Sequence, residues 1–490
     1  MATTLPASPT PHAQPAGPRG PKPSALAEAD LVESPPDLER AVADAIGPSA
    51  LRAPAPNRAQ TGSVRPQAPP APPTGERRAG AGLAVAYVVA YLTMYIALMT
   101  PVMSTLAVKV GSLTTDSGKV VALSLVTGVG AFFAFVANPI AGALSDRTTS
   151  KLGMRRPWLF GGVLGGAVGL AIIGLATQIW MVVVGWAIAQ GCFNATQAAL
   201  QAILPDQIPE RMRAKVSGWL GVAQNVAPLI GIALAFWFAD AGLPISLMII
   251  VPAVLGVAGV FTLAFLLKDR VLRPEEATPF QMFSFLKSFW VSPKQFPDFA
   301  WAWLGRFLIF FGFASYNNYQ VYFLQDRFGY SAAQALSWQL RLMVVQAVML
   351  TLAAAIGGQL SDRTGRRKIF VIIAAVLAGL GLAVFAIAES PLVLYYGAGL
   401  WGLGLGAYLA VDIALVTDVL PNARTEAAKN LGVFNIANAL PQSLAPAVAP
   451  AFLAIGATTA MSANYTSLFL VAAVFALAGA ATTMFIRGAK

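Results

Sequence analysis

Long apolar runs separated by short polar turns dominate this chain from residue 83 to its end. A run of about 20 apolar residues is long enough to cross a bilayer. Because the hydrocarbon core offers no water to bond the backbone, such a run has to be helical. We therefore predict an all-α membrane protein with twelve transmembrane helices. The predicted spans are 83–107, 120–144, 157–176, 180–204, 215–239, 244–267, 299–323, 332–360, 369–388, 391–419, 430–455 and 464–486.

Two stretches of the sequence echo each other. Ser-Asp-Arg-Thr closes one apolar run at Asp146 and another at Asp362, and each copy is followed by a cluster of basic residues. These aspartates are 216 positions apart, as are Pro205 and Pro421 at the ends of the fourth and tenth runs. Two markers with one offset indicate a duplicated unit. We expect two pseudo-symmetric six-helix bundles, at 83–267 and 299–490, joined by a cytoplasmic linker at 268–298.

Residues 1–82 differ from the rest in composition. Half of the 34 prolines fall within the first 80 residues, among many alanines and few large apolar residues. Such a segment buries too little surface to offset the entropy of ordering it. We predict a disordered cytoplasmic tail, and its role stays open between simple solvation and a regulatory contact.

The basic residues are placed asymmetrically. The turns after even-numbered spans hold 20 Lys and Arg, whereas those after odd-numbered spans hold Lys109, Lys119 and Arg327. The positive-inside rule puts the first set and both termini in the cytoplasm, in a multi-pass protein of the plasma membrane. The net charge of +11 is thereby explained without nucleic acid.

Few residues here suit metal or cofactor chemistry. Cys192 is the one cysteine and lies in an apolar run, and the one histidine, His12, lies in the tail. A disulfide and a cysteine or histidine metal site are excluded. An enzyme would also need clustered carboxylates within the spans, where Asp412 stands alone. We predict neither enzymatic activity, nor a metal, nor a cofactor.

The sequence resembles the major facilitator superfamily. The turn Gly142-x-x-Ser145-Asp146-Arg147 and its copy at 357–367 are similar to the signature of that family. Asn138-Pro139 followed by Arg155-Arg156-Pro157-Trp158 is similar to the glycoside–pentoside–hexuronide and sucrose-type symporters. The resemblance implies secondary transport by alternating access. Melibiose-type members bind sodium through acidic residues in span 2, and span 2 of this chain has none. Proton coupling, or no coupling, is favoured over sodium.

The resemblance also implies a cytoplasmic gate in the basic turns. A carboxylate there would accept hydrogen bonds from a helix end and from arginine, closing that side of the protein. The alternative is that these charges only set topology. The gate candidates are Asp146, Arg147, Arg155, Arg156, Asp362, Arg363 and Arg366.

Charged residues inside the spans are costly unless they are paired or wetted. Arg306 and Asp412 each lie about 10 Å deep from the cytoplasmic side at 1.5 Å per residue. In the family, spans 7 and 10 face the central cavity. We expect Asp412 to be the proton-coupling site with Arg306 as its partner, or else a permanent structural pair. Arg341 has no evident acidic partner and can snorkel to the interface.

Uncharged polar residues form stripes within several spans. In span 4, Gln190, Asn194, Gln197 and Gln201 share one helical face. Amides both donate and accept hydrogen bonds, which suits hydroxyl-rich ligands, although polar residues in membrane bundles also bond neighbouring helices. A stripe of tyrosines at 87, 91 and 95 suits sugar rings or helix packing equally. The predicted substrate-binding residues are Gln190, Asn194, Gln197, Gln224, Asn225, Asn317, Tyr319, Gln320, Asn435 and Asn438.

Taken with the resemblance, these features favour one function. We expect a monomeric transporter that moves a small polar solute, a sugar or glycoside, across the bilayer together with a proton. Two alternatives remain. One is an exporter of amphipathic organic molecules on the same fold, and the other is a sensor that binds solute without moving it.

Overall fold

The computed structural model describes residues 81–276, 291–421, 427–457 and 463–488. The predicted tail and the middle of the predicted linker lie outside the described residues. The described part is built from helices and contains no strand. Each predicted span overlaps one long helix, and the ends differ by no more than about six residues. The fold prediction is therefore confirmed.

The helices follow one another with short turns between them. The first span combines α2 (Ala81–Thr100), the π-helix η1 (Pro101–Thr105) and α3 (Leu106–Leu113). The first half continues with α4 (Lys119–Ser145), α5 (Arg156–Leu175), α6 (Ile179–Gln207), α7 (Glu210–Asp240) and α8 (Ile245–Leu266). After a 3-10 turn, η2 (Pro274–Glu276), the second half comprises α10 (Pro297–Phe328), α11 (Ala332–Thr364), α12 (Arg367–Ile387), α13 (Val393–Asp418), α14 (Ala427–Ala454) and α15 (Tyr465–Met484).

Most of these helices can cross a membrane. Among the described residues, eleven helical segments are long and apolar enough for that, counting α2, η1 and α3 as one. The remaining long helix, α14, has 28 residues and contains Pro441, Pro446 and Pro450. At 1.5 Å per residue it is about 42 Å long, enough to cross the hydrocarbon core. The chain is a multi-pass membrane protein.

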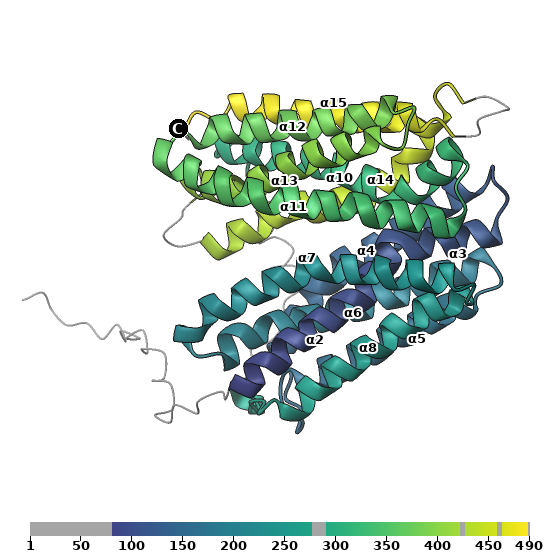
Figure 1. The fold of residues 1–490 in the computed structure, drawn as a ribbon. Coiled ribbons are helices and arrows are strands. Elements are labelled where there is room, and N and C mark those ends of the chain that lie inside the picture. Colours follow the sequence, from purple (N-terminus) through teal and green to yellow (C-terminus); the bar gives the residue numbers. More distant parts are fainter. Residues whose placement is uncertain (1–80, 277–290, 422–426, 458–462, 489–490) are drawn as a thin grey trace, which may run out of the picture. The chain divides into compact units, whose positions relative to one another are not determined.

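Helices of each half pack in the same pattern. In the first half, α2 packs against α7 and α8, α4 against α6, and α5 against α6 and α8. In the second half, α10 packs against α14 and α15, α11 against α13, and α12 against α13 and α15. Figure 1 shows α2, α5, α6, α7 and α8 in one group and α10 to α15 in the other. The duplication read from the sequence is repeated in the helix pairings.

Two glycine crossings mark the repeat at atomic detail. A Cβ on Gly169 of α5 would lie 2.6 Å from both Gly185 O and Ala189 N of α6. A Cβ on Gly381 of α12 would lie 2.9 Å from Gly397 O of α13. Gly381 and Gly397 lie 212 positions after Gly169 and Gly185. This offset is four less than 216, because the turn that follows Asp362 is four residues shorter than the turn that follows Asp146. Such close backbone approach is how helices pack tightly in lipid.

The first span contains an irregular turn. Pro101 has no N–H, and a five-residue π-turn accommodates it, with Leu106 N donating to Pro101 O. The Thr100 hydroxyl donates to Ile96 O at 2.6 Å, and Ser104 donates to Thr100 O at 3.1 Å. These hydroxyls supply hydrogen bonds where the regular ladder is interrupted.

The two bundles meet along two seams, α4 against α14 and α7 against α11. We name the ends of the helices by residues. The Asp146 end carries the turns that follow α4, α6 and α11, and the Lys119 end carries those that follow α3, α5 and α10. At the Lys119 end, Tyr322 donates to Ala107 O at 2.9 Å and Gln339 donates to Met103 O at 2.8 Å.

Candidate functional site

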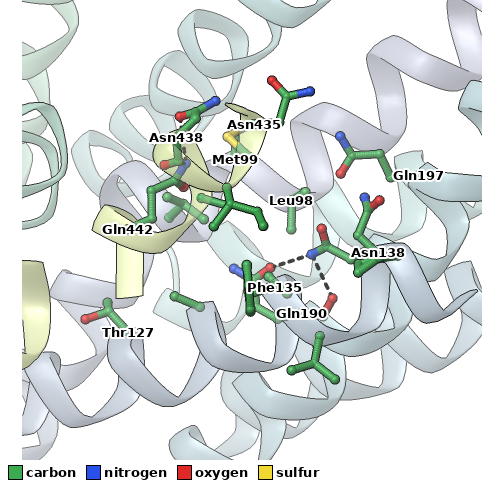
Figure 2. A pocket seen from close by; sticks show the side chains of 18 of the residues that line it. Leu98, Met99, Thr127, Phe135, Asn138, Gln190, Gln197, Asn435, Asn438 and Gln442 are labelled. Atoms are coloured by element: carbon green, nitrogen blue, oxygen red, sulfur yellow. Dashed lines mark hydrogen bonds between the residues drawn. The ribbon is translucent and has the colours of Figure 1, made fainter. Parts of the chain in front are cut away.

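A cavity of about 720 Å³ lies between the bundles. Side chains of α2, η1, α4 and α6 line it from the first half, and those of α10 and α14 from the second. Figure 2 shows Gln190 and Gln197 on one side and Asn435, Asn438 and Gln442 on the other. Its volume falls within the usual range for small-molecule sites.

The amide stripe predicted in α6 faces this cavity. Gln190, Asn194, Gln197 and Gln201 all belong to its lining, as the helical period requires. Asn194 Nδ2 donates to both the carbonyl and the side-chain oxygen of Gln190, at 2.9 and 3.0 Å. Only 8% of each of these two residues is exposed. They are therefore held in place before any solute binds.

Two tyrosines connect this wall to neighbouring helices. The rings of Tyr91 and Tyr95 stack with centroids 4.7 Å apart. The Tyr95 hydroxyl accepts from Gln197 Nε2 at 2.5 Å and from Gln224 Nε2 at 3.0 Å, and Gln224 also donates to Tyr91 at 2.6 Å. Tyr95 lines the cavity. It joins α2, α6 and α7 in one hydrogen-bonded wall.

The wall from the second half is less constrained. Asn435, Asn438 and Gln442 follow one face of α14 and line the cavity. Gln442 Nε2 lies at 3.4 to 3.5 Å from the oxygens of Asn438, which is a long hydrogen bond. These amides are available to exchange this weak contact for one with a solute.

Five of the ten predicted binding residues lie outside the lining. Gln224 supports Tyr95, and Asn225 is exposed and donates to Gly221 O. Three residues of α10 have partners elsewhere. Asn317 donates to Phe313 O, the Tyr319 hydroxyl lies 2.6 Å from that of Ser124, and Gln320 donates to Tyr316. Span 7 contributes Asn318 to the cavity instead.

Sequence reasoning missed several lining residues of α4 and α6. Thr127, Asn138 and Trp186 line the cavity, together with apolar residues such as Met99 and Phe135. Thr127, Phe135 and Asn138 recur at a helical spacing, so the helical period of span 2 could have placed them on one face. The described lining contains no charged side chain.

Arg306 and Asp412 form a buried ion pair. Arg306 Nη1 lies 2.5 Å from Asp412 Oδ2, and their side chains are 7% and 4% exposed. The guanidinium also lies over the rings of Phe310 and Phe434, 5.2 and 4.6 Å from the centroids. The two residues form the expected pair, and neither of them belongs to the described lining of the cavity. They lie instead among α10, α13 and α14.

At the Asp146 end, Arg155 is the centre of a polar cluster. Its guanidinium pairs with Asp146 at 2.6 Å and with Asp206 at 3.0 Å, and it donates to Ser145 at 2.9 Å. Asp269 accepts from the backbone N–H groups of Arg155 and Arg156 at the start of α5, where the helix dipole favours a carboxylate. The Arg156 guanidinium donates to Leu267 O, and that of Arg147 to Ala143 O at 2.6 Å.

The second half has a counterpart of this cluster, formed by residues other than the predicted gate candidates. Arg367 pairs with Asp418 at 2.6 Å, with the same 51-residue separation as Arg155 and Asp206. Lys368 donates to Met484 O at the end of α15 and to Ile486 O just beyond it, much as Arg156 donates to Leu267 O just beyond α8. The predicted gate residues Asp362, Arg363 and Arg366 are exposed, and within the described part of the chain they form no ion pair.

Several solved structures of similar fold are transporters. A bacterial homologue of the human lysosomal transporter Spinster matches with a TM-score of 0.64 and 15% identity, over 84% of this chain and 97% of that one. The nucleoside transporter NupG matches with 0.64 and 12%, over 83% and 100%. The human organic anion transporter MFSD10 matches with 0.59 and 15%, over 82% and 98%. At these identities the likeness concerns the fold alone.

Sequence comparisons point the same way. A stretch of 148 residues, 30% of this chain, is 34% identical to the class H tetracycline resistance protein of Pasteurella multocida. The chain covers only about a third of that protein's length. The family model of the Major Facilitator Superfamily matches residues 83–446 and 333–489, which is most of the chain. This protein therefore belongs to the major facilitator superfamily, whose members are transporters.

Proposed function

We propose that this transporter carries an uncharged, hydroxyl-rich solute, such as a sugar or glycoside, by alternating access through the cavity between its bundles. The observation that carries the proposal is the composition of the lining. Amide side chains of α6 and α14 face each other across the cavity, and the described lining includes no charge.

This composition selects among solutes by their chemistry. Amides donate and accept at once, so they match hydroxyl groups without a fixed polarity. An ionised solute would lose its hydration in a cavity without a compensating charge, which is costly. Trp186 and Tyr95 add aromatic surface on the same wall. A neutral polyol or sugar satisfies all of these groups.

The motif in the first basic turn supports the sugar-transporting branch. Asn138 of the resembling motif lies in the cavity, and Arg155 of the same motif organises the turn at the Asp146 end. By the positive-inside rule we assign the Asp146 end, and both termini, to the cytoplasm of a plasma-membrane protein.

We assign proton coupling to Asp412 and Arg306. If Asp412 bound a proton, Arg306 would be a buried charge without its counter-ion, and the helices around it would have to adjust. Phe434 of α14 covers the guanidinium, and the next residue, Asn435, lines the cavity. A change at the pair thus reaches the solute site through one helix. In this proposal the ion pair acts on the cavity through α14, without lining the cavity itself.

Transport into proteoliposomes tests the proposal. Uptake would be measured over a panel of neutral sugars, sugar acids and amino sugars, with and without an imposed pH gradient. We expect uptake of a neutral sugar that is accelerated by an inward proton gradient. Solute exchange without net uptake in the absence of a gradient would still indicate transport, whereas binding without exchange would identify a sensor.

A second candidate is export of amphipathic organic molecules. Leu98, Met99 and Phe135 make part of the cavity wall apolar, and one stretch of the chain is similar to a tetracycline resistance protein. Extrusion of a fluorescent drug from inverted vesicles, together with no uptake of any sugar, would favour this candidate over the first.

A further inference from the structure

A salt bridge joins the two bundles at the Lys119 end. Lys119 Nζ of α4 lies 2.6 Å from Asp326 Oδ1 of α10, and the lysine also lies over the Tyr322 ring at 5.3 Å. The lysine side chain is 9% exposed and the aspartate side chain 29%. Tyr465 donates to the other carboxylate oxygen at 2.6 Å. Both oxygens of Asp326 are therefore occupied.

The positions of these two charges are unfavourable within their own helices. Lys119 is the first residue of α4, where the helix dipole favours an anion, and Asp326 lies two residues before the end of α10, where it favours a cation. Neither residue stabilises the helix that carries it. Across the two halves, however, each charge meets a partner of opposite sign, which offsets its unfavourable position in its own helix.

The other ion pairs described above act within a half. Arg155 holds Asp206, Arg367 holds Asp418, and Arg306 is paired with Asp412 inside the second bundle. Those pairs would persist while the bundles move against each other. The contact between Lys119 and Asp326 would break in such a movement, because its two residues belong to opposite halves.

We propose that Lys119 and Asp326 form a charge lock that holds the bundles together at the Lys119 end and has to separate before solute passes that end. The lock sets the balance between the closed and open forms of this entrance. It does not depend on which solute is carried. The hydrogen bonds from Tyr322 to Ala107 O and from Gln339 to Met103 O close the same entrance without charge.

Distance measurements between spin labels test the lock in the full-length protein in nanodiscs. Labels at Ser117 and Glu389, exposed residues of opposite halves at this end, would be introduced after Cys192→Ser removes the native thiol. We expect Lys119→Met and Asp326→Asn each to raise the ratio of open to closed molecules by about fivefold, as for a partly exposed pair. Asp116→Asn is the matched control. Asp116 also contacts Lys119, at 3.1 Å, but belongs to the same half and is 94% exposed.

Reversal of the charges gives the sharper result. Lys119→Asp combined with Asp326→Lys, in the Asp116→Asn background, restores the attraction and places each charge at the helix end that favours it. We expect this variant to be closed at least as often as the parent protein and to transport more slowly. Single variants that stay closed, or a reversed pair that stays open, would overturn the proposal. If the single variants do not fold, the reversed pair decides. Because distances are read without solute, failure of the sugar assay leaves this result intact.

Discussion

Replacement of Asp412 by leucine separates a structural role of the buried pair from a role in coupling. The change leaves Arg306 charged and buried without its carboxylate. Removing one partner of a buried pair costs about 3–5 kcal/mol. Stacking on Phe310 and Phe434 is present in the parent protein as well, so it does not offset this loss. We therefore expect the single variant to lose about 3–5 kcal/mol of stability, measured by unfolding of the purified protein.

The double variant Arg306→Met with Asp412→Leu removes both charges. Apolar replacement of a buried pair is often neutral or stabilising, so we expect stability to return to within about 1 kcal/mol of the parent. If the pair couples transport to protons, the double variant should still carry solute down the solute's own concentration gradient. It should no longer accumulate solute when a pH gradient is imposed. Accumulation equal to that of the parent, in a double variant that folds, would refute the coupling role.

Three further predictions concern other parts of the molecule. Tyr95→Phe removes the hydroxyl that accepts two amide hydrogen bonds, and we expect the KM for solute to rise about tenfold, with little change in kcat, in uptake kinetics. Gly169→Ala places a methyl group against the α6 backbone and should cost about 1–3 kcal/mol in unfolding experiments, whereas Gly161→Ala, which has nothing within 4 Å of its added carbon, should be neutral. Arg155→Lys cannot bridge two carboxylates and a hydroxyl, so we expect a lower unfolding temperature and slower transport; a variant with unchanged values for both would contradict the role given to this cluster.

The sequence predicts helices well because lipid imposes a simple rule on them. An apolar run has to satisfy its own backbone, so its existence and length follow from composition. The α6 stripe faces the cavity for a similar reason, since the helical period alone puts Gln190 and Gln201 on one face.

Partners that lie far apart in the chain were harder to predict. Asp206, Asp326 and Asp418 each sit close to the end of an apolar run, where a charge reads as a topology signal. Their significance comes from residues 51 or 207 positions away, brought near by helix packing. The amides of span 7 show the opposite error. Asn317 and Gln320 have the right chemistry, but the rotation of α10 keeps both out of the cavity lining, and rotation is set by packing.

The glycine crossings have a consequence for how this protein moves. In each half, the third and fourth helices touch backbone to backbone, and such contacts leave no room for sliding. Each half is then expected to turn as one solid piece, with the strain of the cycle concentrated along the two seams. The first half presents to those seams one helix that contains Pro139 and another that contains Pro228, and the second half presents one with three prolines. Bending in the cycle would thus fall on proline-containing helices, and the crossings would stay rigid.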